Sequence, residues 1–183
     1  MSGDGRIEPG ATVFLDRDGT INVPAPEGEY ITAPEQVALL PGAAKAIRTL
    51  NELPASVVVV TNQRGIALGL MGEEDLARVN ERLVELLAAE GARLDAIYHC
   101  PHEKGACECR KPGPAMFERA ARELEGVELE GAVMVGDSAL DVEAGRRLGM
   151  TTIRLGEPEP GDPMADHGAA DLAAAVRRLS GLS

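Results

Sequence analysis

A chain of 183 residues is long enough to bury one hydrophobic core, and a content of 44% hydrophobic and 26% charged residues is ordinary for a globular protein. The formal net charge of −12 argues against nucleic acid and anionic membrane surfaces as partners, because both require clustered Lys and Arg. The sequence has no apolar run of about 18 residues and no basic start followed by an apolar stretch. We therefore expect neither a membrane span nor a secretory signal, and the cytoplasm is the expected compartment.

The chain opens on a glycine-rich stretch that leads into a short apolar one. Residues 1–10 are polar, and we expect them to form a flexible N-terminus. A buried strand is expected to follow and to end at Leu15, where two carboxylates, Asp16 and Asp18, and a turn-forming glycine interrupt the apolar run. Prolines and a glycine then keep residues 23–33 irregular, so this loop is expected to lie beside the carboxylates and to contact a substrate.

Patterns typical of helices and strands alternate along the rest of the chain. Apolar residues at helical spacing predict helices over residues 43–53, 73–90, 114–124 and 140–148, and Asp171 is a candidate cap for a last helix. Short apolar runs predict strands over residues 57–60, 94–99, 132–135 and 151–155, with a loop over 156–168. The alternation predicts an α/β fold, a doubly wound Rossmann-like parallel sheet, in a single domain over residues 11–183.

Polar residues follow four of the expected strands. They are Asp16 and Asp18 after the first strand, Thr61-Asn62-Gln63 after the second, a Cys/His loop ending in Arg110-Lys111 after the third, and Gly136-Asp137-Ser138 after the fourth. Ligands of open parallel sheets bind outside the carboxyl ends of the strands. The four groups are therefore expected to converge on one site.

The two carboxylates at the end of the first strand suit phosphoryl transfer. Asp16 is the predicted nucleophile, which forms an aspartyl-phosphate, and Asp18 would protonate the leaving oxygen and later deprotonate water. Acids this close together need a cation, and Asp16, the backbone carbonyl of Asp18 and Asp137 are the expected Mg²⁺ ligands. An Asx turn at Asp18 and a helix N-cap at Asp137 are the purely structural alternatives.

A second set of residues is predicted to hold the phosphate or the substrate. Thr61 and Asn62 offer a hydroxyl and an amide to the phosphate oxygens, and Gln63 and Arg64 follow them directly. Lys111 would supply the positive charge that offsets the phosphate and the nucleophilic carboxylate. Taken alone, Thr61 and Asn62 could belong to a polar turn after a strand. Lys111 and its neighbour Arg110 could likewise be a pair of solvated surface cations.

Four side chains of residues 100–109 are suitable ligands for a soft metal. Cys100 and His102 form one arm and Cys107 and Cys109 the other, each pair at positions i and i+2. In an extended segment such pairs point to the same side, and a short glycine-containing link brings the arms together. Three thiolates and one imidazole would close the tetrahedral shell of a structural Zn²⁺; the alternative is three incidental cysteines beside a surface histidine.

Four segments carry a resemblance to a known family. FLDRDGTIN (14–22), TNQRGI (61–66), CPHEKGACECRKP (100–112) and VGDSALD (135–141) resemble, in this order, the signature segments of the haloacid dehalogenase superfamily. The loop that ends in Cys-Arg-Lys-Pro is similar to the branch that contains D-glycero-D-manno-heptose 1,7-bisphosphate phosphatases and histidinol-phosphate phosphatases. The resemblance spans roughly residues 11–156.

The resemblance implies a haloacid dehalogenase fold without a large cap domain, a catalytic Mg²⁺, a structural Zn²⁺ and a small phosphorylated metabolite as substrate. It implies the roles already given for Asp16 and Asp18, and it matches Thr61 and Lys111 to the threonine and lysine that hold the phosphate. It also matches Arg110 to an arginine associated with substrate binding in the heptose enzymes. With no cap, the loop 100–109 and the segment 23–33 would shape the pocket.

Within this branch the sequence favours hydrolysis of the 7-phosphate of a heptose 1,7-bisphosphate, because TNQRGIALG follows the pattern common in those enzymes. Two features depart from that pattern: Ser138 replaces a lysine found in many of them, and the spacer between His102 and Cys107 is short. A histidinol-phosphate phosphatase is the alternative, and an inactive zinc-stabilised binding protein is a third reading. The sequence sets neither the anomer nor the oligomeric state, and a monomer is compatible with it.

Overall fold

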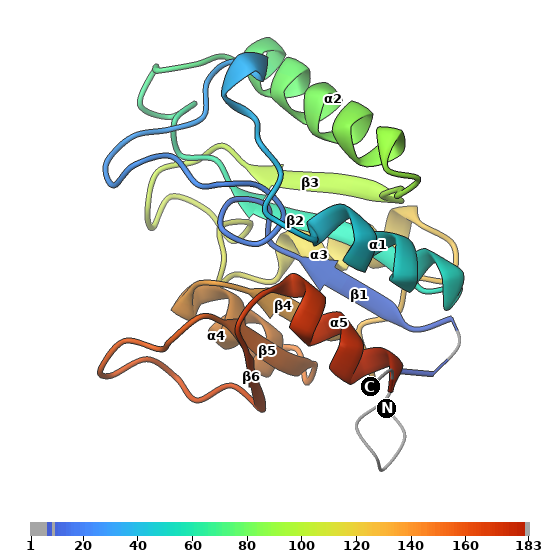
Figure 1. Cartoon of the computed structure of the whole chain (residues 1–183). Coiled ribbons are helices and arrows are strands. Elements are labelled where there is room, and N and C mark those ends of the chain that lie inside the picture. The colour runs from blue at the N-terminus through green and yellow to red at the C-terminus, as the bar shows by residue number, and fades with distance from the viewer. Residues whose placement is uncertain (1–6, 9, 182–183) are drawn as a thin grey trace.

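The computed structural model describes residues 7–8 and 10–181, and its centre is one parallel β-sheet (Figure 1). The strands are β1 (Thr12–Leu15), β2 (Ser56–Asn62), β3 (Ala96–Cys100), β4 (Val133–Gly136), β5 (Thr151–Leu155) and β6 (His167–Ala169). They lie in the order β3-β2-β1-β4-β5-β6, and every neighbouring pair is parallel. The predicted doubly wound sheet is confirmed. Most of the expected flexible N-terminus, residues 1–10, lies outside the described residues.

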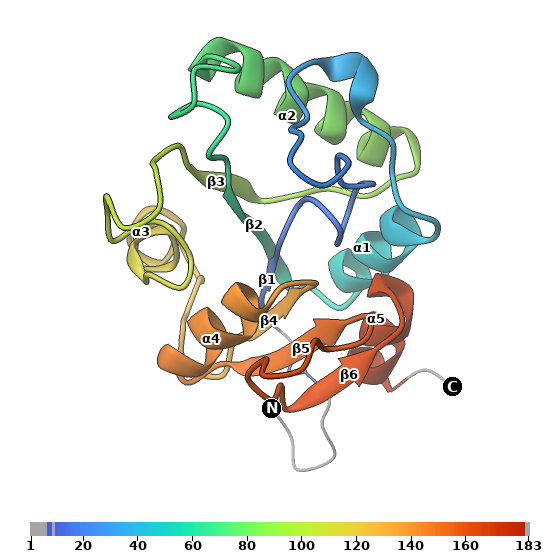
Figure 2. The same ribbon diagram turned by 90° about the vertical axis from the view of Figure 1, so that its left-hand side faces the viewer.

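Helices cover both faces of the sheet (Figure 2). They are α1 (Ala43–Glu52), α2 (Glu73–Ala89), α3 (Ala115–Glu123), α4 (Ala139–Arg147) and α5 (Leu172–Ser180), with a 3₁₀ turn at Pro34–Gln36. Alternate residues of β1 point to opposite faces, as the period of a strand requires. Val13 and Leu15 pack in the core under α1, α2 and α5, whereas Phe14 packs with Phe117 of α3 on the other face.

The strand β6 was not predicted from the sequence. The segment 156–168, expected to be a loop throughout, gives way to the short strand β6 at His167, which pairs with β5 at the edge of the sheet. A strand of three residues with a glycine at its centre has no apolar alternation to reveal it. It is fixed instead by Asp166, whose carboxylate accepts hydrogen bonds from the backbone N–H and the hydroxyl of Thr152.

The remaining differences concern element ends. Strand β3 covers Ala96–Cys100 where 94–99 was expected, and β2 and β4 differ from their expected ranges by one or two residues at each end. The helix ends differ from the expected ones by at most one residue. Asp171 caps α5 as predicted, its side chain accepting a hydrogen bond from the N–H of Ala174 (2.7 Å). Among the described residues, no helix combines the length and apolar character needed to cross a membrane.

Candidate active site

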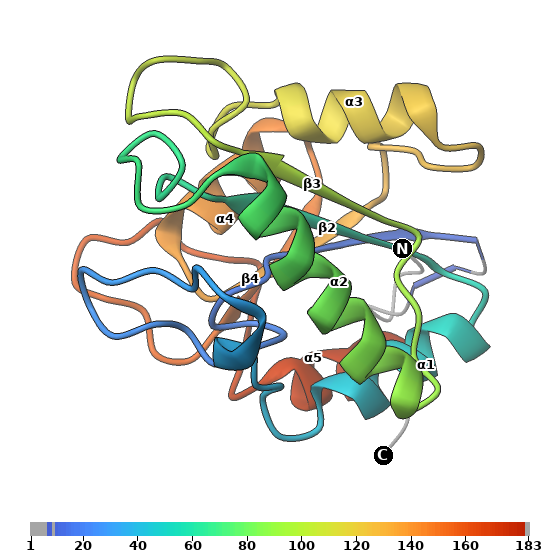
Figure 3. The same ribbon diagram turned by 90° about the horizontal axis from the view of Figure 1, so that it is seen from above.

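The loops that follow the carboxyl ends of the strands gather on one side of the molecule (Figure 3). The first of them starts at Asp16, whose N–H bonds the carbonyl of Val135 (3.0 Å) and so extends the pairing of β1 with β4 by one residue. Because this backbone belongs to the central strands, the Asp16 carboxylate has a fixed place and is only 13% exposed.

A buried lysine lies directly against this carboxylate. Lys111 Nζ is 2.8 Å from Asp16 Oδ1 and 2.6 Å from Asp141 Oδ1, and it also donates to the carbonyl oxygen of Val60 (2.8 Å). Burial lowers the pKa of Lys111, but the two carboxylates outweigh burial and the net shift is upward. The lysine is therefore a permanent cation beside Asp16, and the roles of the two residues in catalysis stay predictions.

Three carboxylates crowd together at this point. One oxygen each of Asp16, Asp137 and Asp141 lies within 4.8 Å of the others. Burial, only partly offset by Lys111, raises the pKa of Asp16 to about 7, and burial together with the charge of Asp141 raises that of Asp137 to about 6. Like charges in a buried site resist ionisation unless a cation is present. An all-oxygen set around a hard divalent cation fits Mg²⁺.

The turn after Asp18 is shaped to pack against Asp137. Gly19 has φ +80°, and a Cβ there would lie 1.9 Å from Asp137 Oδ2. Only glycine permits both this backbone conformation and this approach. The N-cap of α4 is Ser138 rather than Asp137, and the backbone N–H of Ser138 donates to Asp141 Oδ2 (3.0 Å). The capping alternative for Asp137 therefore does not hold, and Asp141 is the capping acid.

Asp18 lies away from this acidic group, in a set of donors. Its carboxylate accepts hydrogen bonds from Arg17, from Asn22 Nδ2 (2.9 Å) and from Gln63 Nε2 (2.8 Å). Burial raises the pKa of Asp18, but Arg17 and these hydrogen bonds outweigh burial and hold the pKa below its usual value. Asp16 and Asp18 are thus in opposite electrostatic environments, the arrangement expected for two acids with different tasks.

The residues at the carboxyl end of β2 and directly after it make different kinds of contact. The Thr61 hydroxyl accepts a hydrogen bond from Gln63 (2.9 Å). Asn62 bonds both the backbone N–H (2.9 Å) and the carbonyl oxygen (3.3 Å) of Lys111, so it fixes the lysine backbone. Arg64 points toward the Cys/His loop and pairs with Glu103 (2.5 Å). The roles of these four residues in holding phosphate stay predictions.

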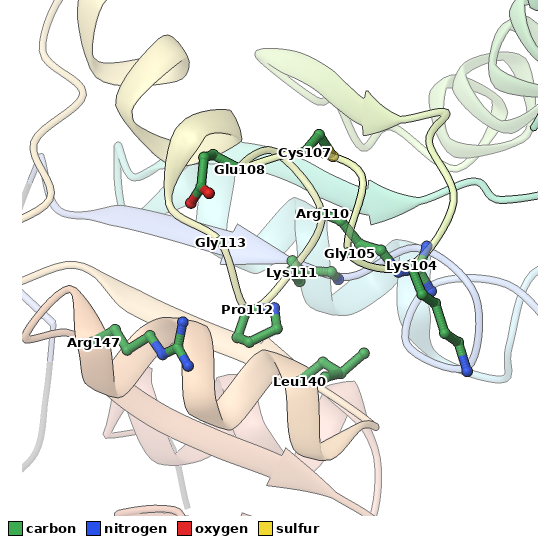
Figure 4. A pocket seen from close by; sticks show the side chains of 10 residues that line it. All are labelled: Lys104, Gly105, Cys107, Glu108, Arg110, Lys111, Pro112, Gly113, Leu140 and Arg147. Atoms are coloured by element: carbon green, nitrogen blue, oxygen red, sulfur yellow. The ribbon is translucent and has the colours of Figure 1, made fainter.

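A cationic pocket of about 400 Å³ adjoins Lys111 between the Cys/His loop and α4 (Figure 4). Lys104, Arg110 and Arg147 line it, together with one acid, Glu108. Arg110 Nη1 is buried and, among residues 7–8 and 10–181, has no hydrogen-bond partner. Positive side chains gather here although the whole chain is strongly acidic. The pocket can therefore accept an anionic group beside Lys111.

The four predicted ligands of the Cys/His loop come together. The sulfur atoms of Cys100, Cys107 and Cys109 lie 3.1–3.5 Å apart, and His102 Nδ1 lies 3.1 Å from Cys109 Sγ and 3.7 Å from Cys100 Sγ. Ligand separations in a tetrahedral zinc site are roughly 3.5–3.8 Å, from bond lengths of about 2.0–2.3 Å. The cluster is slightly tighter than that, and its donor set fits Zn²⁺ with no ligand position left open.

Sequence reasoning missed several residues that order the site. Arg17, Asn22 and Asn80 form one network with Asp18, and Glu103 fixes Arg64. The sequence held one indication of the role of Arg17: it lies between Asp16 and Asp18 at a strand end, where a cation is well placed to pair with one of the two acids. Asn80 carried none, since it lies on a helix 63 residues further along the chain.

Two curated proteins that are similar to this chain have the same name. A curated D-glycero-beta-D-manno-heptose-1,7-bisphosphate 7-phosphatase from Mesorhizobium japonicum is 38% identical over 193 residues, which cover 96% of this chain and 87% of the relative. A relative of the same name from Yersinia pestis is 36% identical over 181 residues, covering 90% of this chain and 94% of its own.

Solved structures agree in fold. The crystal structure of D,D-heptose 1,7-bisphosphate phosphatase from B. bronchiseptica, complexed with magnesium and phosphate, is similar with a TM-score of 0.83 at 32% identity, covering 92% of this chain and 97% of that one. A model of haloacid dehalogenase-like hydrolases matches residues 6–149, a range that contains β1, β2 and β4 and the loops that follow them. The chain therefore belongs to the haloacid dehalogenase-like hydrolase family.

Proposed function

We propose that this chain, as one domain over residues 11–183, is a Mg²⁺-dependent phosphatase that removes the 7-phosphate of D-glycero-D-manno-heptose 1,7-bisphosphate. The observation that carries the proposal is the buried contact of Asp16 with Lys111 (2.8 Å) beside a cationic pocket. A carboxylate held at a strand end against a lysine can attack a phosphate ester, and the pocket offers a place for a second anionic group.

In the first step of this mechanism, an Asp16 oxygen attacks phosphorus and the bond from phosphorus to the sugar oxygen breaks. Asp18 gives a proton to the departing oxygen, and an aspartyl-phosphate remains. In the second step a water oxygen attacks phosphorus, Asp18 takes the proton of that water, and the Asp16 carboxylate is released with inorganic phosphate. Lys111 and Thr61 hold the phosphoryl oxygens in both steps.

Asp16, Asp137 and the backbone carbonyl of Asp18 would hold Mg²⁺. The ion supplies charge that offsets the phosphoryl oxygens. The raised pKa values of Asp16 (about 7) and Asp137 (about 6) support a cation here, because without one these carboxylates repel each other. The similar structure from B. bronchiseptica, which was solved with magnesium and phosphate, supports the same assignment.

The cationic pocket supports a bisphosphate as substrate. Lys104 and Arg110 line it next to Lys111, and a phosphate there would pair with the free Nη1 of Arg110. Ser138 does not contribute, because its hydroxyl bonds Asp141 (2.6 Å) within the cap of α4. The names of the Mesorhizobium and Yersinia relatives specify the β anomer, which we adopt for this chain.

Zn²⁺ at Cys100, His102, Cys107 and Cys109 would have a structural role. Lys111 follows the last of these ligands by two residues, so a fixed loop fixes the catalytic lysine as well. Three unpaired cysteines in one cluster favour a reducing compartment, and we place the enzyme in the cytoplasm on that ground.

A substrate panel tests the proposal. Purified protein with Mg²⁺ is offered the β and α anomers of the heptose bisphosphate and histidinol phosphate, and phosphate release is measured. We expect the heptose bisphosphates to be hydrolysed with the highest kcat/KM, and the Asp16→Asn variant to lose this activity. Turnover of histidinol phosphate alone would overturn the heptose assignment, and wild-type activity in the Asp16→Asn variant would overturn the mechanism.

A further inference from the structure

A buried arginine that the mechanism above does not use lies beside Asp18. The Arg17 side chain is 1% exposed. Its Nε and Nη2 donate to Asp18 Oδ1 (3.2 and 3.1 Å), and Nη2 also donates to Asp18 Oδ2 (2.9 Å). A guanidinium is rarely buried so completely unless its geometry is needed, because its fork fixes the plane of the carboxylate that it binds.

The far side of the same guanidinium is attached to a helix. Arg17 Nη1 donates to Asn80 Oδ1 (3.0 Å), and Asn80 lies in the middle of α2. The buried residues Leu76, Val79 and Leu83 anchor this part of α2 to the core. Arg17 therefore has one end on a rigid helix and the other on Asp18.

In every side-chain hydrogen bond that the structure gives the Asp18 carboxylate, its oxygens are the acceptors. Besides Arg17, Asn22 Nδ2 bonds Oδ1 (2.9 Å) and Gln63 Nε2 bonds Oδ2 (2.8 Å). Donors at both oxygens fix the orientation of the Asp18 carboxyl group. The side chain is still 30% exposed, so water can reach it. The carboxyl group therefore has a fixed orientation in which water can reach it.

We propose that Arg17 is a positioning residue for the water step: its guanidinium fixes the orientation of the Asp18 carboxylate that receives the proton, and Asn80 fixes Arg17. In that step the bond from water oxygen to phosphorus forms, and the bond from phosphorus to Asp16 breaks, its electron pair returning to the Asp16 carboxylate. The proton of water goes to Asp18. The inference rests on the proposed function, since it requires the aspartyl-phosphate.

The test separates the two chemical steps with p-nitrophenyl phosphate and Mg²⁺. Its leaving group departs without help from an acid, so kcat/KM reports formation of the aspartyl-phosphate, whereas slowing of the water step lowers kcat and KM together. For the Arg17→Gln variant we expect kcat to fall about tenfold, KM to fall in parallel and kcat/KM to stay within about threefold of wild type. Rapid mixing should then show a burst of p-nitrophenolate close to one per active site.

Two further variants cover the case in which Arg17→Gln does not fold. Arg17→Lys keeps the charge but cannot bond both Asp18 oxygens and Asn80, and Asn80→Ala removes only the anchor on α2. We expect intermediate, parallel decreases in kcat and KM for both. Arg78→Gln, which removes an exposed arginine from the same helix, is the matched control and should behave as wild type.

Each outcome decides the inference. A decrease in kcat/KM without a decrease in KM and without a burst would show that Arg17 is merely structural, and unchanged kcat in a folded Arg17 variant would also overturn the inference. Wild-type kinetics in Asn80→Ala would remove Asn80 from it. Failure of the wild-type chain to hydrolyse any phosphate ester would instead overturn the proposed function, independently of the Arg17 variants.

Discussion

Replacing Lys111 by methionine should destabilise the protein in a strongly pH-dependent way. The ammonium is 2% exposed and lies 2.8 Å from Asp16 and 2.6 Å from Asp141, which is itself 1% exposed. Lys111→Met keeps most of the volume but leaves two buried carboxylates without their cation. Removing one partner of a buried ion pair typically costs about 3–5 kcal/mol.

The pH dependence follows from the carboxylates left behind. Asp16 already has a pKa of about 7 in the presence of Lys111, and the lysine lowers it. Without the lysine this pKa rises further, so above about pH 7 the folded variant holds a proton that the folded wild type has lost, at a cost of about 1.4 kcal/mol per pH unit. At pH 5 Asp16 is protonated in both folded proteins and the loss of stability is smaller, whereas at pH 8 the full penalty of about 4 kcal/mol for an unpaired buried charge applies.

Urea-induced unfolding of both proteins at pH 5 and pH 8, without added Mg²⁺, measures this difference. Lys45→Met, on the exposed face of α1, is the matched control and should change the free energy of unfolding by less than about 0.5 kcal/mol at either pH. An equal loss of stability at the two pH values, or a loss below about 1 kcal/mol at pH 8, would refute the assignment of Lys111 as the cation that neutralises this buried site.

Three further predictions concern other parts of the molecule. Elemental analysis should find about one zinc per chain, and Cys107→Ser should lower both the zinc content and kcat; zinc-free protein with wild-type kcat would separate the loop from catalysis. Arg110→Met should raise KM for the heptose bisphosphate about tenfold or more and leave KM for p-nitrophenyl phosphate nearly unchanged, and equal effects on both would argue against a second-phosphate site. Asp166→Ala should lower the free energy of unfolding by about 1–2 kcal/mol at pH 7, because the Thr152 hydrogen bonds outweigh burial and lower the pKa of Asp166. This contribution is present above the unfolded pKa of about 3.9 and is lost as pH falls through the lowered pKa of the folded state, so the difference between wild type and variant in urea unfolding should shrink at acid pH.

The sheet and the edge at which the site lies could be predicted because both leave periodic or local signals. Strand β1 is an apolar run that stops at Asp16, and its pattern needs no knowledge of the rest of the fold. The same holds for Asp171, whose capping role depends on the N–H of Ala174 three residues later. Since parallel strands present their carboxyl ends at one edge, knowing the fold class was enough to place Asp16, Lys111 and Asp137 together.

The contacts that orient the site could not be predicted, because they join segments with no local relation. Arg64 was assigned to the phosphate from its place after β2, but its partner Glu103 lies 39 residues away in the Cys/His loop. Asn62 offers the same amide to a phosphate or to the Lys111 backbone, and only the approach of the two loops selects the backbone. Side chains with several available partners are decided by tertiary packing.

The position of the Cys/His loop explains why a structural zinc would matter to an enzyme whose chemistry needs none. Lys111 must reach Asp16 from a loop outside the sheet, and a loop of this length is mobile unless it is fixed at several points. Asn62 fixes the backbone of Lys111 from β2, and the metal ligands would fix it from the other side, since Cys109 is two residues away. A lysine held from both sides loses little freedom when it binds a phosphoryl group, which is the condition for stabilising a transition state electrostatically.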